Sequence, residues 1–274
     1  MHRAFLMLAF PNAKINLGLD VLRKRPDGYH DLETCLYPIP WYDVLEILPA
    51  REFSFTQTGL KVPGAPNENL CVKAYELIKS EYAISPVAIH LHKVVPMGAG
   101  LGGGSADGAF TLKLLNAIFN LQLSLEQQKR HAAFLGSDCP FFIENIAALA
   151  TGTGTDLRPI ELDLSQYHIG IIKPDVHVST ARAYSGVEPG AKSYKLALSL
   201  SKPLRTWRAF VRNDFEKSIF NEFQTIRQTK EKIDRDGAVY SAMSGSGSSV
   251  FGLFSAEISN KADYQLFKPL ILNT

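Results

Sequence analysis

A dense run of glycines, VVPMGAGLGGGSADGAF at residues 94–110, is the segment whose composition most clearly indicates chemistry. Glycine is used this densely where the backbone must approach another group closely or adopt a positive φ. The run follows strand-like sequence and precedes helical sequence, so several N–H groups and the positive end of a helix converge on one point. That arrangement suits a phosphate group. A tight turn that needs glycine only for its shape is the alternative.

Two common phosphate-binding patterns do not fit this run. Residues 98–103 satisfy G-x-G-x-x-G, but a dinucleotide fold also requires an acidic residue after a second strand, about 20 residues further on. Here that distance falls in helical sequence near residues 120–124. A Walker A loop requires Gly-Lys-Ser/Thr, whereas this chain has Ser105 and Ala106 there, and the nearest upstream lysine, Lys93, lies on the preceding strand.

Three further segments contain candidate functional groups. Lys14 and Asn16 in PNAKINLGL are two residues apart, so on a strand they lie on the same face. Asp138 in LGSDCPFF occupies a polar gap between a helix and an aromatic pair, where it could act as a base or simply cap the loop. SAMSGSGSSVFG at 241–252 is a second glycine–serine loop, which by itself could be only a hairpin.

The surrounding sequence predicts the elements that position these groups. Strands are expected over 4–10, 15–22, 53–59, 87–96 and 168–174, helices over 69–82 and from 124 to 136, and a strand–turn–strand unit over 237–254. Apolar spacing predicts a helix after the glycine run and one long helix carrying Phe215, Ile219, Phe223 and Ile226. Because the elements do not alternate as regular βαβ units, the fold class is predicted to be α+β.

Composition restricts the class of protein. The chain has 274 residues and a net charge of +2, so it lacks the basic character of a nucleic-acid-binding protein. Three widely separated cysteines, Cys35, Cys71 and Cys139, indicate reduced, half-buried thiols. The apolar run at 4–10 is followed by Pro11 and not by a cleavage site, and no segment approaches the ~18–20 apolar residues of a membrane span. We therefore expect a cytoplasmic protein.

Taken together, these motifs resemble the GHMP kinase superfamily. The phosphate-loop sequence, PNAKINLGL and SGSGSSVFG occur in the order typical of that family across almost the full chain. The resemblance implies a two-domain α+β fold, with a ribosomal-protein-S5-like N-terminal domain and a ferredoxin-like C-terminal domain. We expect residues 1–158 to form the first domain, with the phosphate loop and the catalytic residues, and residues 159–274 the second.

Longer segments narrow the resemblance. Residues 13–34, 100–109, 136–142 (GSDCPFF) and 212–216 (RNDFE) are similar to the family members that phosphorylate a cytidine diphosphate derivative of methylerythritol in the non-mevalonate route to isoprenoid precursors. The Pro-Asp-Gly-Tyr-His segment is the discriminating part. Asn12, Cys139 and Ser244 stand where proline, valine and threonine are usual. This implies a small-molecule partner, no nucleic acid, no membrane, and a monomer or homodimer.

The resemblance also implies roles for particular residues in catalysis. Asp138 would take the proton of the substrate hydroxyl, and Lys14 would lie beside it and polarise that hydroxyl. Mg²⁺ would accompany ATP, with Ser105 as the candidate ligand. A side chain at Gly103 would be expected to block the approach of phosphate. The implied ATP-binding residues are Pro96, Met97, Gly98, Ala99, Gly100, Leu101, Gly102, Gly103, Gly104, Ser105 and Ala106.

Recognition of the cytosine base would fall to a second group of residues. Tyr29 would stack on the base and His30 would hydrogen-bond its edge, although without the family an exposed turn is the simpler interpretation. Tyr184 would supply a second aromatic ring, with Thr180 nearby and Asn16 also in contact with substrate.

Three alternatives to this function remain open. Another small-molecule GHMP kinase would share the same motifs. A nucleotide-dependent oxidoreductase would need the acidic strand end that is missing here. A non-catalytic nucleotide- or RNA-binding module would need a basic face that a net charge of +2 does not indicate.

Overall fold

The computed structural model describes residues 7–192, 194–258 and 261–268, and it contains two compact units that interleave along the chain. The first unit comprises residues up to Ala13, 41–97 and 102–145; the second comprises 14–40, 98–101 and the chain from Ile146 onward. Strand residues before Pro40 pair with strand residues after Ile146, so both segments belong to the second unit. The division into domains at 158/159 stays a prediction.

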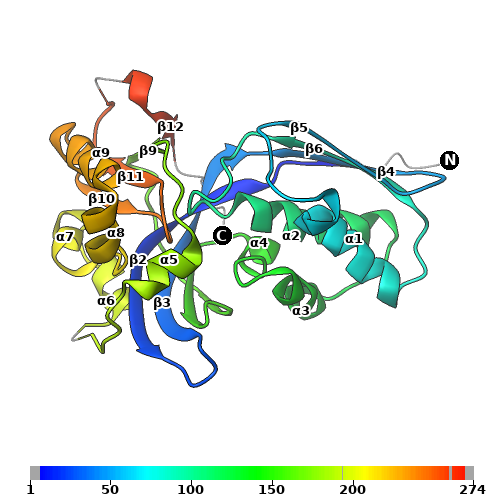
Figure 1. The fold of residues 1–274 in the computed structure, drawn as a ribbon, viewed down its shortest axis with the longest axis horizontal. Coiled ribbons are helices and arrows are strands. Elements are labelled where there is room, and N and C mark those ends of the chain that lie inside the picture. The colour runs from blue at the N-terminus through cyan, green and yellow to red at the C-terminus, as the bar shows by residue number, and fades with distance from the viewer. Residues whose placement is uncertain (1–6, 193, 259–260, 269–274) are drawn as a thin grey trace. The chain divides into compact units, whose positions relative to one another are not determined.

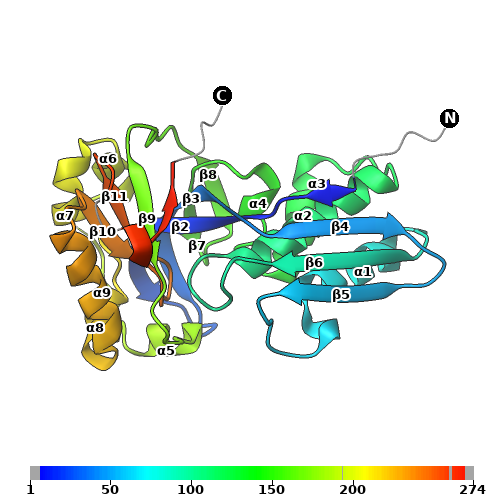
Figure 2. The ribbon, with the colours of Figure 1, turned by 90° about the horizontal axis from the view of Figure 1, so that it is seen from above.

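The first unit is a four-stranded sheet with helices on one face (Figures 1 and 2). Its strands lie in the order β1 (Leu8–Ala9), β4 (Val44–Pro49), β6 (Val87–Lys93) and β5 (Ser54–Gly59). The β4–β6 pair is antiparallel and the β5–β6 pair is parallel. Its helices are η1 (Pro66–Glu68), α1 (Leu70–Glu81), α2 (Gly103–Ile118), α3 (Leu125–Leu135) and α4 (Phe141–Glu144).

Local sequence signals account for these elements. The alternation predicted for the 87–96 segment is confirmed, because Val87, Ile89 and Leu91 of β6 are buried. Helix α1 begins after Asn69, whose side chain accepts a hydrogen bond from Cys71 N. Helix α3 begins with the predicted capping box, in which Ser124 and Gln127 satisfy each other's backbone N–H groups.

The second unit contains two four-stranded sheets. One has the order β2 (Asn12–Lys24), β3 (His30–Tyr42), β7 (Ala148–Gly152) and β8 (Asp156–Pro159), and the first residues of β2 and the last of β3 belong to the first unit. The other is antiparallel, with the order β10 (Tyr240–Met243), β11 (Val250–Phe254), β9 (His168–Ile172) and β12 (Gln265–Phe267). Its helices are α5 (Thr180–Ser185), α6 (Leu196–Leu200), η2 (Leu204–Thr206), α7 (Trp207–Phe210), α8 (Glu216–Glu222), α9 (Gln224–Arg235) and η3 (Lys261–Asp263).

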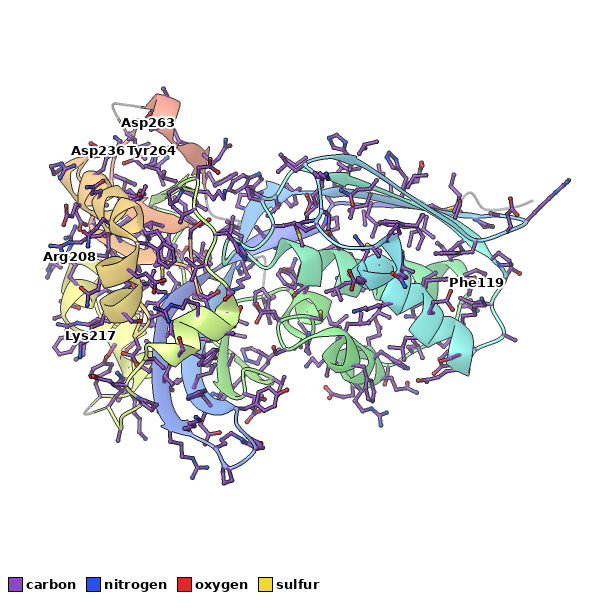
Figure 3. The ribbon with its side chains drawn as sticks, viewed as in Figure 1. Phe119, Arg208, Lys217, Asp236, Asp263 and Tyr264 are labelled. Atoms are coloured by element: carbon purple, nitrogen blue, oxygen red, sulfur yellow. The ribbon has the colours of Figure 1, made fainter. Side chains whose placement is uncertain are left out.

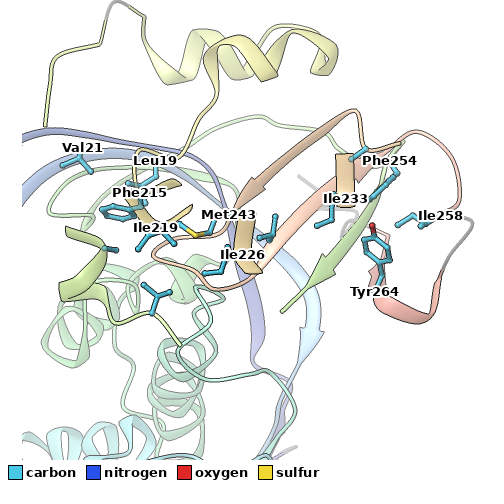
Figure 4. Close-up of a cluster of buried hydrophobic side chains, with 14 residues drawn as sticks. Leu19, Val21, Phe215, Ile219, Ile226, Ile233, Met243, Phe254, Ile258 and Tyr264 are labelled. Atoms are coloured by element: carbon cyan, nitrogen blue, oxygen red, sulfur yellow. The ribbon is translucent and has the colours of Figure 1, made fainter. Parts of the chain in front are cut away.

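One predicted helix needs correction, and one predicted strand lies partly outside the described residues. The expected long helix is two helices, α8 and α9, which meet at Phe223, whose backbone is not helical, with φ of −114° and ψ of 81°. This break allows residues of both helices, Ile219 and Ile226, to be buried in the same core (Figure 4). The strand expected over 4–10 is described only in part, as β1, because residues 1–6 lie outside the described residues.

The C-terminal segment is attached to the end of α9 by polar contacts. Lys232 Nζ lies 2.7 Å from Asp236 Oδ2, and the Tyr264 hydroxyl donates to the same oxygen at 2.7 Å. Figure 3 shows Asp236, Tyr264 and Asp263 gathered at this end of the helix. The hydrogen bonds to Lys232 and Tyr264 hold the pKa of Asp236 below its usual value.

The cysteines are free, as predicted, but they are fully buried and not half-buried. Burial raises the pKa of the Cys139 thiol to about 12. In the part of the chain that the structure describes, no helix combines the length and the apolar character that crossing a bilayer requires.

Candidate active site

The glycine run forms a loop in which the chain leaves the first unit after Met97 and returns to it at Gly102. Left-handed backbone recurs at every second residue, with φ of +61° at Gly98, +76° at Gly100 and +71° at Gly102. At Gly100 a close approach adds to this requirement, since a Cβ there would lie 1.9 Å from the carbonyl oxygen of Ser244. Both reasons for dense glycine that the sequence suggested therefore apply to this loop.

Within the second unit, three consecutive loop carbonyls are held by groups from other segments. Leu101 O accepts from Lys14 N at 2.8 Å, and Ala99 O accepts from Ser249 N at 3.1 Å. Gly100 O accepts from the Ser244 hydroxyl at 2.8 Å. The N-terminal strand and the second glycine–serine loop thus both hold the first glycine loop, although the three segments are far apart in the sequence.

Lys14 and Asn16 lie on the same face of β2, as their spacing predicts, and both are buried. The Lys14 ammonium donates to Asn16 Oδ1 at 2.6 Å and to Gly100 O at 3.2 Å. Asn16 Nδ2 donates in turn to Thr34 Oγ1 at 3.0 Å. Both of these acceptors are neutral oxygens, and they fix the direction of the Lys14 ammonium.

Within the first unit, the loop leads directly into helix α2. The N-cap is Gly102 and the helix begins at Gly103, so Ser105 does not cap the helix and instead lies in its first turn. The Ser105 hydroxyl contacts the thiol of Cys139. Ala106 N already donates to Gly102 O at 2.9 Å, so the N–H groups that favour an anion are those of the first helical residues, 103–105.

Gly103 has a packing role that differs from the one expected from the sequence, which was to leave room for phosphate. A Cβ at this residue would lie 2.9 Å from Val95 Cγ1 and 3.0 Å from Lys93 Nζ, so glycine is needed for packing of α2 against the chain leading out of β6. A side chain there would therefore disturb the protein's own interior and would not simply block a ligand. At Gly104 a Cβ would meet only the flexible end of Met97, with Cε at 3.1 Å.

Beneath this helix start lies an ion cluster that sequence reasoning missed. Lys93 Nζ lies 2.5 Å from Asp43 Oδ2 and 2.6 Å from Asp107 Oδ2, and the three side chains are 0–3% exposed. Asp43 Oδ1 also accepts from the backbone N–H groups of Val94 and Val95, at 2.5 and 2.8 Å. Burial raises the pKa of Asp107 to about 7, against the opposing effect of Lys93. The sign of this cluster in the sequence was Lys93, a lysine at the end of an apolar strand and next to the glycine run.

Asp138 lies in the predicted gap, between the end of α3 at Leu135 and the start of α4 at Phe141, and is half-buried. Its neighbour Cys139 donates its N–H to Gly136 O at 3.1 Å and contacts Ser105 through its thiol. The segment between α3 and α4 therefore contacts the first turn of α2, and Asp138 is adjacent in sequence to the residue that makes this contact.

The residues expected to recognise cytosine belong to the second unit. Tyr29, at the turn between β2 and β3, is 67% exposed, and its N–H and carbonyl are held by Asp27 Oδ1 and Arg25 N at 3.1 and 2.8 Å. The His30 ring stacks on that of Tyr184 in α5, with centroids 4.8 Å apart and planes at 20°. Burial and the charge of Lys24 lower the pKa of His30, which favours a neutral ring. Thr180, the first residue of α5, is exposed.

A cavity of about 310 Å³ lies beside the start of α2 within the first unit. Apolar side chains dominate its walls, among them Phe55, Val62, Pro63 and Met97. Gly104 and Asp107 also line it, and Asp107 Oδ1 has no hydrogen-bond partner in the protein. The proline-rich 63–66 segment that forms one wall was predicted only as a loop.

The fold and these motifs define a class of protein. The family model for the N-terminal domain of GHMP kinases matches residues 69–145, and that for their C-terminal domain matches residues 196–265. The chain belongs to the GHMP kinase family, which confirms the predicted α+β fold and a kinase activity that uses ATP. Mevalonate kinase from Methanococcus jannaschii shares the fold, with a TM-score of 0.68 at 13% identity over 98% of this chain and 99% of that one.

Within that class the chain is strongly similar to one kind of enzyme. The 4-diphosphocytidyl-2-C-methyl-D-erythritol kinase of Cytophaga hutchinsonii is 52% identical over 92% of this chain and 93% of its own length. That of Bacteroides fragilis is 50% identical over the same shares of the two chains. A crystal structure of 4-(cytidine 5'-diphospho)-2C-methyl-D-erythritol kinase superposes with a TM-score of 0.77 at 31% identity, covering 90% of both chains. Within the GHMP family, the chain is a member of the 4-diphosphocytidyl-2-C-methyl-D-erythritol kinases.

Proposed function

We propose that this protein transfers the γ-phosphoryl group of ATP to the 2-hydroxyl of 4-diphosphocytidyl-2-C-methyl-D-erythritol, a step of the non-mevalonate route to isoprenoid precursors. Relatives that carry this name match more than nine-tenths of the chain. The structural observation that carries the proposal is the hydrogen bond from the Lys14 ammonium to Gly100 O, at 3.2 Å. It unites the N-terminal motif with the phosphate loop.

In the proposed reaction, the Asp138 carboxylate accepts the proton of the substrate hydroxyl. The hydroxyl oxygen forms a bond to the γ-phosphorus as the bond from that phosphorus to the β-phosphate oxygen breaks, and ADP leaves. Lys14 stabilises the negative charge that develops on the attacking oxygen. Because phosphoryl transfer requires mainly positioning and charge stabilisation, residues 96–106 provide much of the catalysis by holding the polyphosphate.

The nucleotide base of ATP fits the cavity in the first unit. The cavity of about 310 Å³ beside Gly104 has a volume within the range of small-molecule sites and a mainly apolar lining, which supports this assignment. Asp107 Oδ1, buried and without a partner in the protein, provides an acceptor for an amino group on that ring.

We assign Mg²⁺ to the start of α2, where it would bind together with the nucleotide phosphates. Ser105 offers a hydroxyl oxygen there, and the described residues contain no cluster of three His, Cys, Asp or Glu side chains suited to a metal. Mg²⁺ commonly takes only one or two protein ligands when phosphate oxygens supply others. When bound, it neutralises charge on the phosphates.

For the acceptor substrate, we assign the cytosine site to Tyr29, His30 and Tyr184, with Thr180 and Asn16 also contacting substrate. The His30 and Tyr184 rings stack on each other, so they lie at one place in this unit, and the exposed Tyr29 ring is available to stack on a base. We further propose a cytoplasmic enzyme that acts as a monomer or homodimer and binds neither nucleic acid nor membrane. Three free thiols support a reducing compartment.

A panel assay tests this function. ADP release is measured with ATP and one of four acceptors: the diphosphocytidyl compound, mevalonate, homoserine or galactose. We expect turnover with the first alone. Turnover with another acceptor would identify a different GHMP kinase, and turnover with none would favour a non-catalytic nucleotide- or RNA-binding role.

A further inference from the structure

Ser244, in the turn between β10 and β11, is fully buried and uses both capacities of its hydroxyl group. Its oxygen accepts a hydrogen bond from Asn16 N at 3.3 Å, and its hydrogen is donated to Gly100 O at 2.8 Å. Gly100 O is also the acceptor of the Lys14 ammonium, which in turn contacts the Asn16 side chain. One hydroxyl group therefore connects the strand that carries Lys14 with the loop carbonyl that orients Lys14.

We propose that Ser244 is a positioning residue that sets the orientation of the Lys14 ammonium through the Gly100 carbonyl. The inference rests on the proposed function only for what the ammonium does, since the contacts themselves lie within the second unit. A carbonyl oxygen has two lone pairs, and here one is directed at Ser244 and the other at Lys14. Removing the hydroxyl takes away the bond that fixes the direction of this carbonyl, so the acceptor of the ammonium is held less firmly.

The turn that carries Ser244 is itself held by the RNDFE segment at 212–216. Asn213 Nδ2 donates to Met243 O and to Gly245 O, both at 2.8 Å, on either side of Ser244. Met243 N donates to Glu216 Oε1 at 2.7 Å. These bonds immobilise the backbone around Ser244, so its hydroxyl direction is determined before any ligand binds. The RNDFE motif thereby acquires a role in the site.

A purely structural role for Ser244 makes a different prediction. Deleting a buried hydroxyl leaves its partners unsatisfied and lowers stability wherever it occurs. Ser241, three residues earlier in β10, provides the matched control, because its buried hydroxyl donates to Asp234 Oδ1 at 2.7 Å on α9. Only Ser244 contacts the Lys14 network, so only its loss is expected to affect the chemical step.

The test compares Ser244→Ala, Ser241→Ala and Ser244→Thr in the full-length protein. With ATP and the diphosphocytidyl substrate, we expect Ser244→Ala to lower kcat about five- to thirtyfold, the rate equivalent of one buried hydrogen bond, with KM for ATP changed less than about threefold. Ser241→Ala should keep kcat within about twofold at a similar loss of stability in urea. Ser244→Thr, which retains a hydroxyl, should restore most of the activity.

A second readout does not depend on turnover. The Nζ resonance of Lys14, assigned by its loss in Lys14→Arg, should shift in Ser244→Ala and remain unchanged in Ser241→Ala. Equal kinetic losses in the two alanine variants, or an unshifted Lys14 resonance, would overturn the inference. Absence of turnover in the wild-type protein would instead refute the proposed function, and the resonance alone would then decide the role of Ser244.

Discussion

Replacing Lys93 with methionine tests the ion cluster beneath the phosphate loop most directly. The substitution keeps an unbranched side chain but leaves Asp43 and Asp107 buried together without a cation. Because the lysine side chain is 0% exposed and lies within 2.6 Å of both carboxylates, solvent cannot replace it. Breaking a buried pair of this kind costs about 3–5 kcal/mol, against a total stability of about 5–15 kcal/mol for a typical domain.

The two units can be followed separately in this experiment. The chain has two tryptophans, Trp41 in the first unit and Trp207 in the second, so Trp41→Phe and Trp207→Phe backgrounds report on one unit each. Lys93 belongs to the first unit. In urea, we expect the midpoint of the Trp41 transition of Lys93→Met to move down by about 1–5 M, given slopes of about 1–3 kcal/mol per M.

A compensating variant separates charge from packing. Lys93→Met combined with Asp107→Asn leaves only Asp43 charged, and Asp43 keeps its hydrogen bonds from Val94 N and Val95 N. The double variant should therefore regain more than half of the lost stability. If Lys93→Met leaves the urea midpoint of the Trp41 transition unchanged, the ammonium does not hold this cluster together. A double variant no more stable than the single one would assign the loss to packing.

Three further predictions concern catalysis, recognition and pH. Asp138→Asn should lower kcat by about 10²- to 10⁴-fold with the Kd for ATP nearly unchanged, whereas a wild-type rate would reduce Asp138 to a loop cap. Tyr29→Ala should raise KM for the cytidine substrate about five- to a hundredfold without affecting KM for ATP, and unchanged KM values would exclude stacking on this ring. Burial raises the pKa of Asp20 to about 6 and that of Glu216 to about 7. The native state therefore holds protons that the unfolded chain releases above pH 4.5, so the free energy of unfolding should fall as pH rises from about 4.5 to 7. Urea titrations of Glu216→Gln should show a weaker dependence, and a wild-type slope would refute this assignment.

Much of the local structure was predictable because it depends on near neighbours. The alternation of Val87, Ile89 and Leu91 predicts a half-buried strand, and Ser124 with Gln127 predicts the start of a helix. The glycine run predicts a close backbone approach, which the structure contains at Gly100. Periodicity nevertheless predicted one helix where Phe223 separates two, because it reports which face is apolar and not whether the axis continues.

In the candidate site, too, some features could be predicted from the sequence and others could not. Residue type and spacing identified the glycine loop and placed Lys14 and Asn16 on one face, and both follow from chemistry within a few residues. The partners that orient Lys14 and Asn16 could not be inferred from the sequence. Gly100 O, Ser244 and Thr34 meet Lys14 and Asn16 across up to 228 positions of sequence, and a backbone carbonyl is present at every residue, so nothing in the sequence distinguishes the one that is used.

Lys93 shows that the burial of a charged group could not be predicted from the sequence either. Its position at the end of an apolar strand was visible in the sequence, but a lysine there is equally compatible with solvent exposure. Only the packing of α2 against the chain leaving β6 removes water from its ammonium and brings Asp43, 50 residues earlier, to the same point as Asp107. The sequence by itself determined which groups carry charge and which segments are strand, loop or helix. The tertiary structure decided which charges are buried together, because burial depends on long-range contacts that no local pattern records.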